Sequence, residues 1–234
     1  MRPFQSKTNS LRRMREMGVE VGTILDVGVH EQTPELREVF PDKRHLLFEP
    51  ADDFYTAIRQ NYSNLDYEII EAAVSDFDGI ISLKKDRFEG KVVTHSRIAV
   101  SDGTSDMPKV QTVRLDTFLR SRNEARPYFL KIDVDSVELE ILSGCEGIFK
   151  DVDVIAVEVT QPTLFERFSF LQSKGYQFFD LVDAVYNHGM FYQADLIVVS
   201  ARVMSLDNLR PWQTKPFDWA HWVPTALYES MIQV

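Results

Sequence analysis

Cysteine is nearly absent from this sequence, because Cys145 is the only one among 234 residues. A single thiol cannot form a disulfide within the chain, and no second thiol or pair of histidines completes a zinc-type site. Cys145 also lies in a stretch with helical spacing, where a buried small side chain is more common than a nucleophile. We therefore expect no metal centre and no thiol chemistry.

Long apolar runs are absent as well. No uninterrupted apolar stretch approaches the roughly 18 residues that a membrane span needs. The first residues also lack the apolar core of a signal peptide. We expect a cytoplasmic protein without a membrane span.

Positive charge is scarce, since 26 Lys and Arg stand against 36 Asp and Glu and give a formal net charge of −10 at pH 7. An anionic field of this kind repels phosphate backbones. The one basic cluster, Arg12, Arg13 and Arg15, is short and predicts one face of an N-terminal helix. Composition therefore argues against nucleic acid as a partner.

Short β-branched runs alternate with amphipathic stretches along most of the chain. This alternation is typical of βαβ units and predicts an α/β fold with a mostly parallel sheet covered on both faces. The predicted strands are residues 21–29, 44–49, 66–74, 128–134, 152–159 and 195–200, with a weaker one at 176–182. The predicted helices are residues 34–40, 53–61, 116–121, 137–149 and 164–174.

Three segments follow from this pattern. Residues 1–22 form a predicted helical extension, 23–200 the main domain, and 201–234 an aromatic and proline-containing tail that packs on the domain. Between Asp76 and Val113 the alternation breaks, because Asp-Gly turn signals flank a short alternating run. We expect this interval to be an excursion outside the main sheet.

Four predicted strands end in a carboxylate, namely Asp26, Glu49, Asp133 and Glu158. In an open parallel sheet, ligands bind outside the carboxyl ends of the strands, so these acids would meet at one edge. Each acid could instead cap the helix that follows it. Taken together, the four favour a ligand site.

The first turn and the second strand indicate what the ligand is. Glu49 follows Gly28 by 21 residues, the spacing at which an acid reaches ribose hydroxyls. A dinucleotide site needs further glycines to hold the pyrophosphate, whereas the sequence after Gly28 is Val-His-Glu-Gln-Thr. S-adenosylmethionine has no phosphate and carries two cationic groups, which an acidic edge attracts. The pattern therefore favours S-adenosylmethionine over NAD.

A further acidic group follows the strand at 128–134. Asp135 and Glu138 have the spacing of a capping box, which is more common than metal binding for such a pair. Asp133 precedes the box and could face a ligand. Asp116 is interpreted in the same way, as the cap of a helix over 117–120.

The segment Leu-Lys-Ile-Asp-Val-Asp-Ser-Val-Glu-Leu-Glu-Ile-Leu-Ser-Gly, residues 130–144, resembles the signature of FkbM-type methyltransferases. Matches also occur at Asp26-Val27-Gly28, at Phe48-Glu49-Pro50 and around Asp76, Asp116 and Glu158, so the resemblance covers about residues 23–200. It implies a Rossmann-like class I methyltransferase fold with seven strands and a terminal antiparallel hairpin. It also implies S-adenosylmethionine as cofactor and a hydroxyl of a sugar or natural product as acceptor, hence a small-molecule or glycan partner.

The same resemblance implies a role for each motif residue. The donor's methionine part would lie near Asp26 and Gly28, its ribose on Glu49, its adenine near Asp76, and its methyl group beside Asp133. His30 follows the first strand and could cover the donor pocket. The family's second glycine is absent from the first turn.

An O-methyltransferase also needs a base for the hydroxyl proton. Asp133 is the first candidate, followed by His95 in the excursion, His188 in a turn-like stretch, and His30. Each histidine could equally be a turn or loop residue. Two other functions stay open: an NAD-linked oxidoreductase or epimerase, although a Tyr-x-x-x-Lys pair is lacking, and a non-catalytic domain that keeps the fold.

Overall fold

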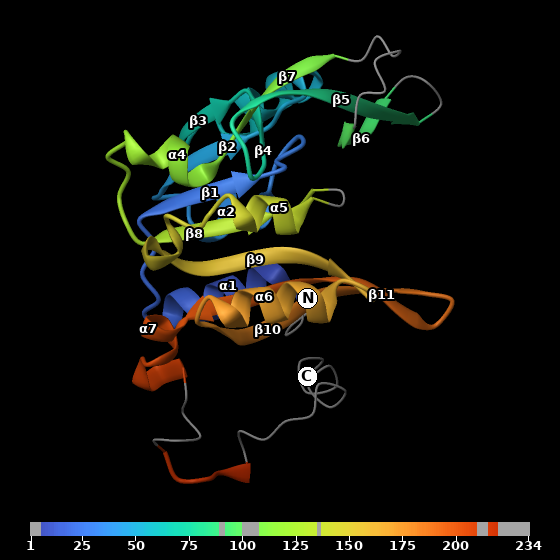
Figure 1. Ribbon diagram of the computed structural model, residues 1–234. Coiled ribbons are helices and arrows are strands. Elements are labelled where there is room, and N and C mark those ends of the chain that lie inside the picture. Colours follow the sequence, from blue (N-terminus) through green and yellow to red (C-terminus); the bar gives the residue numbers. More distant parts are fainter. Residues whose placement is uncertain (1–5, 89–91, 100–107, 135–136, 210–214, 220–234) are drawn as a thin grey trace. The chain divides into compact units, whose positions relative to one another are not determined.

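The computed structural model describes residues 6–88, 92–99, 108–134, 137–209 and 215–219, with the backbone alone for 84–88 and 92–99 (Figure 1). The chain divides into two compact units. One spans Val21–Glu158, and the other combines Met1–Glu20 with Val159–Val234.

Parallel strands form the centre of the unit Val21–Glu158. β1 (Thr23–Val27) pairs with β2 (Arg44–Phe48) on one side and β8 (Tyr128–Ile132) on the other. β3 (Asp66–Ile70) continues the sheet beyond β2, and β9 (Val152–Thr160) continues it beyond β8. Every residue of β1 and β8 is buried, as expected for strands with both faces covered.

The helices of this unit are short. They are α2 (Pro34–Val39), the 3-10 turn η1 (Asp52–Phe54), α3 (Tyr55–Asn61), α4 (Leu115–Arg120), α5 (Glu138–Ser143) and the 3-10 turn η2 (Phe149–Asp151). α5 ends six residues earlier than the end predicted for it. Its C-cap Gly144 packs so tightly that a Cβ atom there would lie 2.2 Å from the Ser75 carbonyl oxygen.

A second sheet has the strand order β4-β7-β5-β6. Its strands β5 (Gly79–Phe88), β6 (Val92–Ala99) and β7 (Lys109–Val113) belong to the interval after Asp76, and β4 (Ala72–Val74) precedes it. The predicted strand over 66–74 is therefore divided, because residues 72–74 pair with β7. β5 pairs antiparallel with both β6 and β7. The predicted excursion outside the main sheet is confirmed.

The other unit contains α1 (Lys7–Glu16), α6 (Leu164–Ser173), β10 (Tyr176–Asn187), β11 (Met190–Ser200), α7 (Ala201–Met204) and the 3-10 turn η3 (Asp207–Leu209). β10 and β11 form a long antiparallel hairpin, visible in orange in Figure 1. α1 is tied to β10 because Arg13 and the Ser10 hydroxyl both donate to the Asp180 carboxylate at 2.7 Å.

Hydrogen bonding orders the larger sheet as β10-β11-β9-β8-β1-β2-β3. The predicted α/β class with seven mostly parallel strands and an antiparallel hairpin is therefore confirmed. Among the described residues, no helix is long and apolar enough to cross a membrane.

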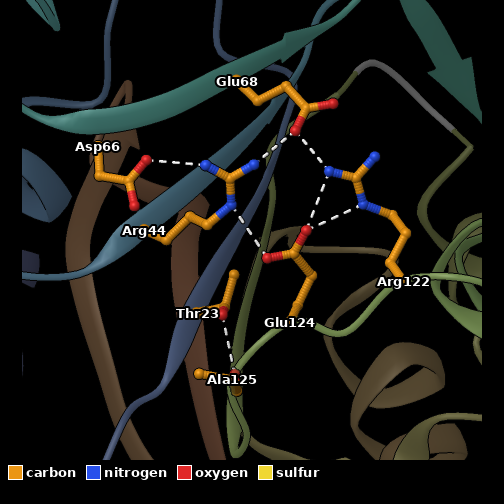
Figure 2. A network of polar contacts seen from close by, with 7 residues as sticks. All are labelled: Thr23, Arg44, Asp66, Glu68, Arg122, Glu124 and Ala125. Atoms are coloured by element: carbon orange, nitrogen blue, oxygen red, sulfur yellow. Dashed lines mark hydrogen bonds and ion pairs between the residues drawn. The ribbon is translucent and has the colours of Figure 1, made fainter.

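An ion-pair network lies at the amino ends of β2 and β3 (Figure 2). Arg44, the first residue of β2, contacts Asp66 at 2.8 Å, Glu68 at 2.6 Å and Glu124 at 3.0 Å. Arg122 contacts Glu124 at 2.9 Å and also Glu68. The network links β2 and β3 to the loop before β8, so these charges lie at the edge opposite to the acids that end the strands.

Candidate functional site

The turn after β1 is built around Gly28, which has a φ of +79°. A Cβ atom at this position would lie 2.0 Å from the carbonyl oxygen of Asp133 and 2.9 Å from Val134 Cγ1. The Gly28 amide donates to the Phe48 carbonyl at 3.1 Å, at the end of β2. The close approach of β8 and the left-handed backbone both require glycine here.

Asp26 lies beneath this turn and is fully buried. It forms an ion pair with Lys131, whose Nζ lies 3.2 Å from Asp26 Oδ1. Within the described part of the chain, neither carboxylate oxygen of Asp26 has a hydrogen-bond partner. α2 begins at Pro34 without any side-chain capping bond, so the helix-cap interpretation of Asp26 does not hold.

Lys131 brings three groups of the site together. It lies in β8 directly opposite Asp26 in β1, and its side chain is only 3% exposed. Its ammonium donates to the Gly28 carbonyl at 2.7 Å and lies 3.5 Å from Asp133 Oδ2. Lys131 is not among the residues predicted for the site. Its sequence signal is a lysine inside an otherwise apolar strand, because a buried lysine needs a partner.

Glu49 directly follows β2 and is 3% exposed. Its Oε2 accepts a hydrogen bond from the His30 amide and its Oε1 one from the Ala51 amide, both at 2.9 Å. Burial raises the pKa of Glu49 to about 7, and the two amide bonds only partly offset this effect. Glu49 thereby joins the first turn to the segment after β2.

His30 has a φ of +55°, a left-handed conformation that is uncommon for a residue with a side chain. Its ring lies against Phe54 with the ring centroids 3.9 Å apart. The amide bond to Glu49 and this ring contact together hold the unusual backbone. His30 therefore lies at the rim of the site, with its ring over η1.

The raised pKa of Glu49 predicts a pH-dependent stability. Between pH 4.5, the ordinary pKa, and about 7, the folded chain binds more protons than the unfolded chain, so stability falls as pH rises. The contribution lost by pH 8 is about 3 kcal/mol. Glu49→Gln should remove this loss, which urea unfolding at pH 5, 6, 7 and 8 would measure. The exposed control Glu20→Gln should keep the wild-type slope, and a Glu49→Gln profile parallel to wild type would contradict the assignment.

Three other predicted residues have different surroundings. Asp76 follows β4, where its Oδ1 accepts from the Ser75 hydroxyl at 3.2 Å and its carbonyl accepts from Arg114 at 2.8 Å. The backbone of His95 lies in β6 opposite Asp86, and its side chain is outside the described part. His188 belongs to the other unit.

His188 and Gly189 form the turn of the β10–β11 hairpin, with φ values of +49° and +79°. Two consecutive left-handed residues are the geometry of a tight hairpin turn. The interpretation of this stretch as a hairpin turn is thus supported. A catalytic role for His188 or His95 remains a prediction.

The remaining acids differ from expectation in position. Glu158 lies inside β9 and not at its end. Asp116 lies inside α4, where Arg114 holds it through two bonds of 2.9 and 2.8 Å and lowers its pKa to about 2, so it is not the predicted helix cap. Asp135 of the predicted capping box lies outside the described residues. Cys145 is fully buried, and burial raises the pKa of its thiol.

The first turn thus lies among three acids and one lysine, which carry a net negative charge when Glu49 is ionised. Such a site attracts a cationic ligand, and Glu49 keeps lone pairs that could accept hydroxyl hydrogens. Asp26 is paired with Lys131, but neither of its oxygens is hydrogen-bonded within the described residues, and it adds to the negative charge beside the turn. These acceptors and charges fit S-adenosylmethionine.

Comparison with protein families gives one match. The profile described as the Methyltransferase FkbM domain matches residues 20–178, which include every strand tip of the candidate site. No match was found among curated proteins.

Solved structures share the fold at low sequence identity. Precorrin-6y C5,15-methyltransferase from Geobacter metallireducens GS-15 is 13% identical, with 82% of this chain and 86% of that chain covered and a TM-score of 0.45. The 23S rRNA methyltransferase ErmE is 10% identical, with 90% and 76% covered and a TM-score of 0.48. The METTL16 methyltransferase domain is 11% identical, with 82% and 66% covered and a TM-score of 0.48.

The exclusion of nucleic acid as a partner is wrong. The 23S rRNA methyltransferase ErmE, by its name an enzyme that acts on RNA, is among the structures similar to this chain. The physical error lies in using a net charge, which is summed over the whole chain, whereas a substrate responds to the field within about 10 Å of where it binds.

Proposed function

The chain belongs to the FkbM methyltransferase family, and on that premise we propose that it transfers a methyl group from S-adenosylmethionine to a hydroxyl of a sugar or natural-product acceptor. Family membership implies the donor. The observation that carries the proposal is the pair of buried acids, Asp26 and Glu49, on either side of the Gly28 turn. They supply an acceptor for a ribose diol and a counter-charge for a cationic amino-acid part.

In this proposal the donor lies across the tips of β1 and β2. Glu49 accepts hydrogen bonds from the ribose hydroxyls, while Asp26 and Gly28 receive the methionine part. His30 closes the rim over the donor, and Asp76 lies towards the adenine. An ionised carboxylate accepts these bonds more strongly than a protonated one. Because the pKa of Glu49 is raised to about 7, donor binding should strengthen as the pH rises through 7.

When bound, S-adenosylmethionine supplies a methyl group already activated on a sulfonium. Transfer forms a bond between the methyl carbon and the acceptor oxygen and breaks the sulfur–carbon bond, so the hydroxyl proton must leave. We assign that proton to the carboxylate of Asp133, which directly follows β8 and is 43% exposed. The half-exposed position leaves Asp133 accessible to an acceptor that arrives from solvent.

Titration calorimetry tests the donor assignment directly. S-adenosylmethionine and S-adenosylhomocysteine should bind with micromolar affinity, about −8 kcal/mol, whereas NAD should not bind. Binding of NAD alone would favour the oxidoreductase alternative. Binding of neither class would identify a non-catalytic domain that keeps the fold.

The role of Asp133 is tested by Asp133→Asn. We expect the methyl-transfer rate to fall by about 10²- to 10⁴-fold, the contribution of a general base, while the dissociation constant of S-adenosylhomocysteine changes little. The control Glu20→Gln alters an exposed acid before β1 and should leave both quantities unchanged. Equal losses in rate and donor affinity would make Asp133 a donor-binding residue instead.

The acceptor class is tested by transfer of radiolabelled methyl from the donor. Separate arms should contain sugars, hydroxylated polyketides and RNA. Label in a sugar or polyketide hydroxyl supports the proposal, whereas label in RNA alone would reject the hydroxyl small-molecule class. A product that carries the label on nitrogen or carbon would reject O-methylation.

A further inference from the structure

A buried lysine at the centre of the site has no role in the function proposed so far. Lys131 is 3% exposed, and burying an ammonium is costly unless it is paired and hydrogen-bonded. Its partners are the Gly28 carbonyl at 2.7 Å, Asp26 at 3.2 Å and Asp133 at 3.5 Å. All three belong to the first turn or to the strand tips beside it.

The contacts of Lys131 hold two parts of the chain in a fixed relation. Its ammonium joins the turn after β1 to the end of β8, and the Asp133 amide repeats this link by donating to the Val27 carbonyl at 3.1 Å. The hydrogen bond from the Lys131 ammonium holds the Gly28 carbonyl towards β8. The orientation of the first turn therefore depends on a side chain from another strand.

We propose that Lys131 is a positioning residue that holds the Gly28 turn and Asp26 in the arrangement that receives the amino-acid part of the donor. This inference rests on the proposed function. It divides the site into two parts that are held by different groups. Lys131 fixes the amino-acid part, whereas Glu49 fixes the ribose part through its bonds to the His30 and Ala51 amides.

The two parts can be separated experimentally because Lys131 and Asp26 act on Glu49 with opposite sign. The Lys131 charge lowers the pKa of Glu49 and the Asp26 charge raises it. Removing both charges together removes two effects of opposite sign. The double variant Asp26→Asn/Lys131→Met also leaves no unpaired buried charge, so it is the variant expected to fold.

The test compares two ligands that differ only in the part of interest. S-adenosylhomocysteine has the amino-acid part, whereas 5′-methylthioadenosine has the same adenosine and thioether without it. Calorimetry would measure both in wild type, in Asp26→Asn and in the double variant, with thermal melting as the check of folding. Asp26→Asn alone separates the effect of the lysine from that of the aspartate.

We expect the double variant to bind S-adenosylhomocysteine at least 10-fold more weakly than Asp26→Asn does, with 5′-methylthioadenosine within 3-fold. Lys131→Arg, which keeps a cation at this position, should retain most of the wild-type preference for S-adenosylhomocysteine. Glu49→Gln should instead weaken both ligands. A loss confined to S-adenosylhomocysteine in the double variant is not expected from a lysine that merely stabilises the fold.

Two results would overturn the inference. One is an equal affinity of Asp26→Asn and the double variant for S-adenosylhomocysteine. The other is an equal loss for both ligands, which is the behaviour of a purely structural residue. If wild type binds neither ligand, the proposed function itself fails, so the two failures are distinguishable.

Discussion

Lys131→Met alone is expected to lower the free energy of unfolding by about 3–5 kcal/mol, the cost of breaking a buried ion pair from one side. The variant leaves Asp26 fully buried, with neither oxygen hydrogen-bonded within the described residues. It also leaves the Gly28 carbonyl without its 2.7 Å bond from the ammonium. Methionine fills most of the lysine volume, so the loss reports the charge and hydrogen bonds and not a cavity.

Urea unfolding at pH 7 measures this loss, and the double variant with Asp26→Asn is its control. Removing both members of a buried pair is often nearly neutral, so the double variant should lie within about 1–2 kcal/mol of wild type. A loss below about 1 kcal/mol in Lys131→Met would show that Asp26 is stabilised by other groups. The same loss in both variants would show that it comes from the Gly28 hydrogen bond, which both variants lack, and not from an unpaired Asp26.

The acids at the strand tips were predicted from sequence because the pattern is local. An apolar run that ends in a carboxylate identifies both the strand and its end, and the parallel arrangement then brings the ends together. Glu49 and Asp133 directly follow β2 and β8, and Asp26 is the penultimate residue of β1. All three are linked through Lys131 or the first turn. Glu158 differs because β9 continues to Thr160, and a longer strand carries no separate sequence signal at its end.

The extent of some elements could not be predicted, because contacts between distant segments determine it. α5 ends at Ser143 because the next residue, Gly144, packs against the Ser75 carbonyl. β10 extends to Asn187, five residues beyond the prediction, because the tight turn at 188–189 continues its pairing with β11. Neither contact is visible in the local apolar pattern.

Lys131 was missed for a different reason. Periodicity shows that β8 is buried, but it does not show which strand pairs with it. The register that places Lys131 opposite Asp26 is a property of the folded sheet. A buried lysine in one predicted strand and a buried aspartate in another could nevertheless have been proposed as partners, since neither is stable alone in a core.

Gly28→Ala is the second substitution with a large expected effect, about 3 kcal/mol or more in the free energy of unfolding. A left-handed backbone with a side chain costs roughly 1–2 kcal/mol. The added Cβ would also lie 2.0 Å from the Asp133 carbonyl oxygen, a backbone atom that moves only if β8 moves. Relief of that overlap separates the first turn from the tip of β8, so donor affinity should fall together with stability.

Gly175→Ala isolates the backbone effect. Gly175 has a φ of +91°, yet a Cβ atom there would meet nothing within 4 Å, so this control should cost only about 1 kcal/mol and leave donor affinity unchanged. The difference between the two variants in urea unfolding therefore measures the overlap with Asp133 and Val134. Equal losses would mean that β8 yields without cost, and the tight contact between the first turn and Asp133 would then have no part in holding the donor site together.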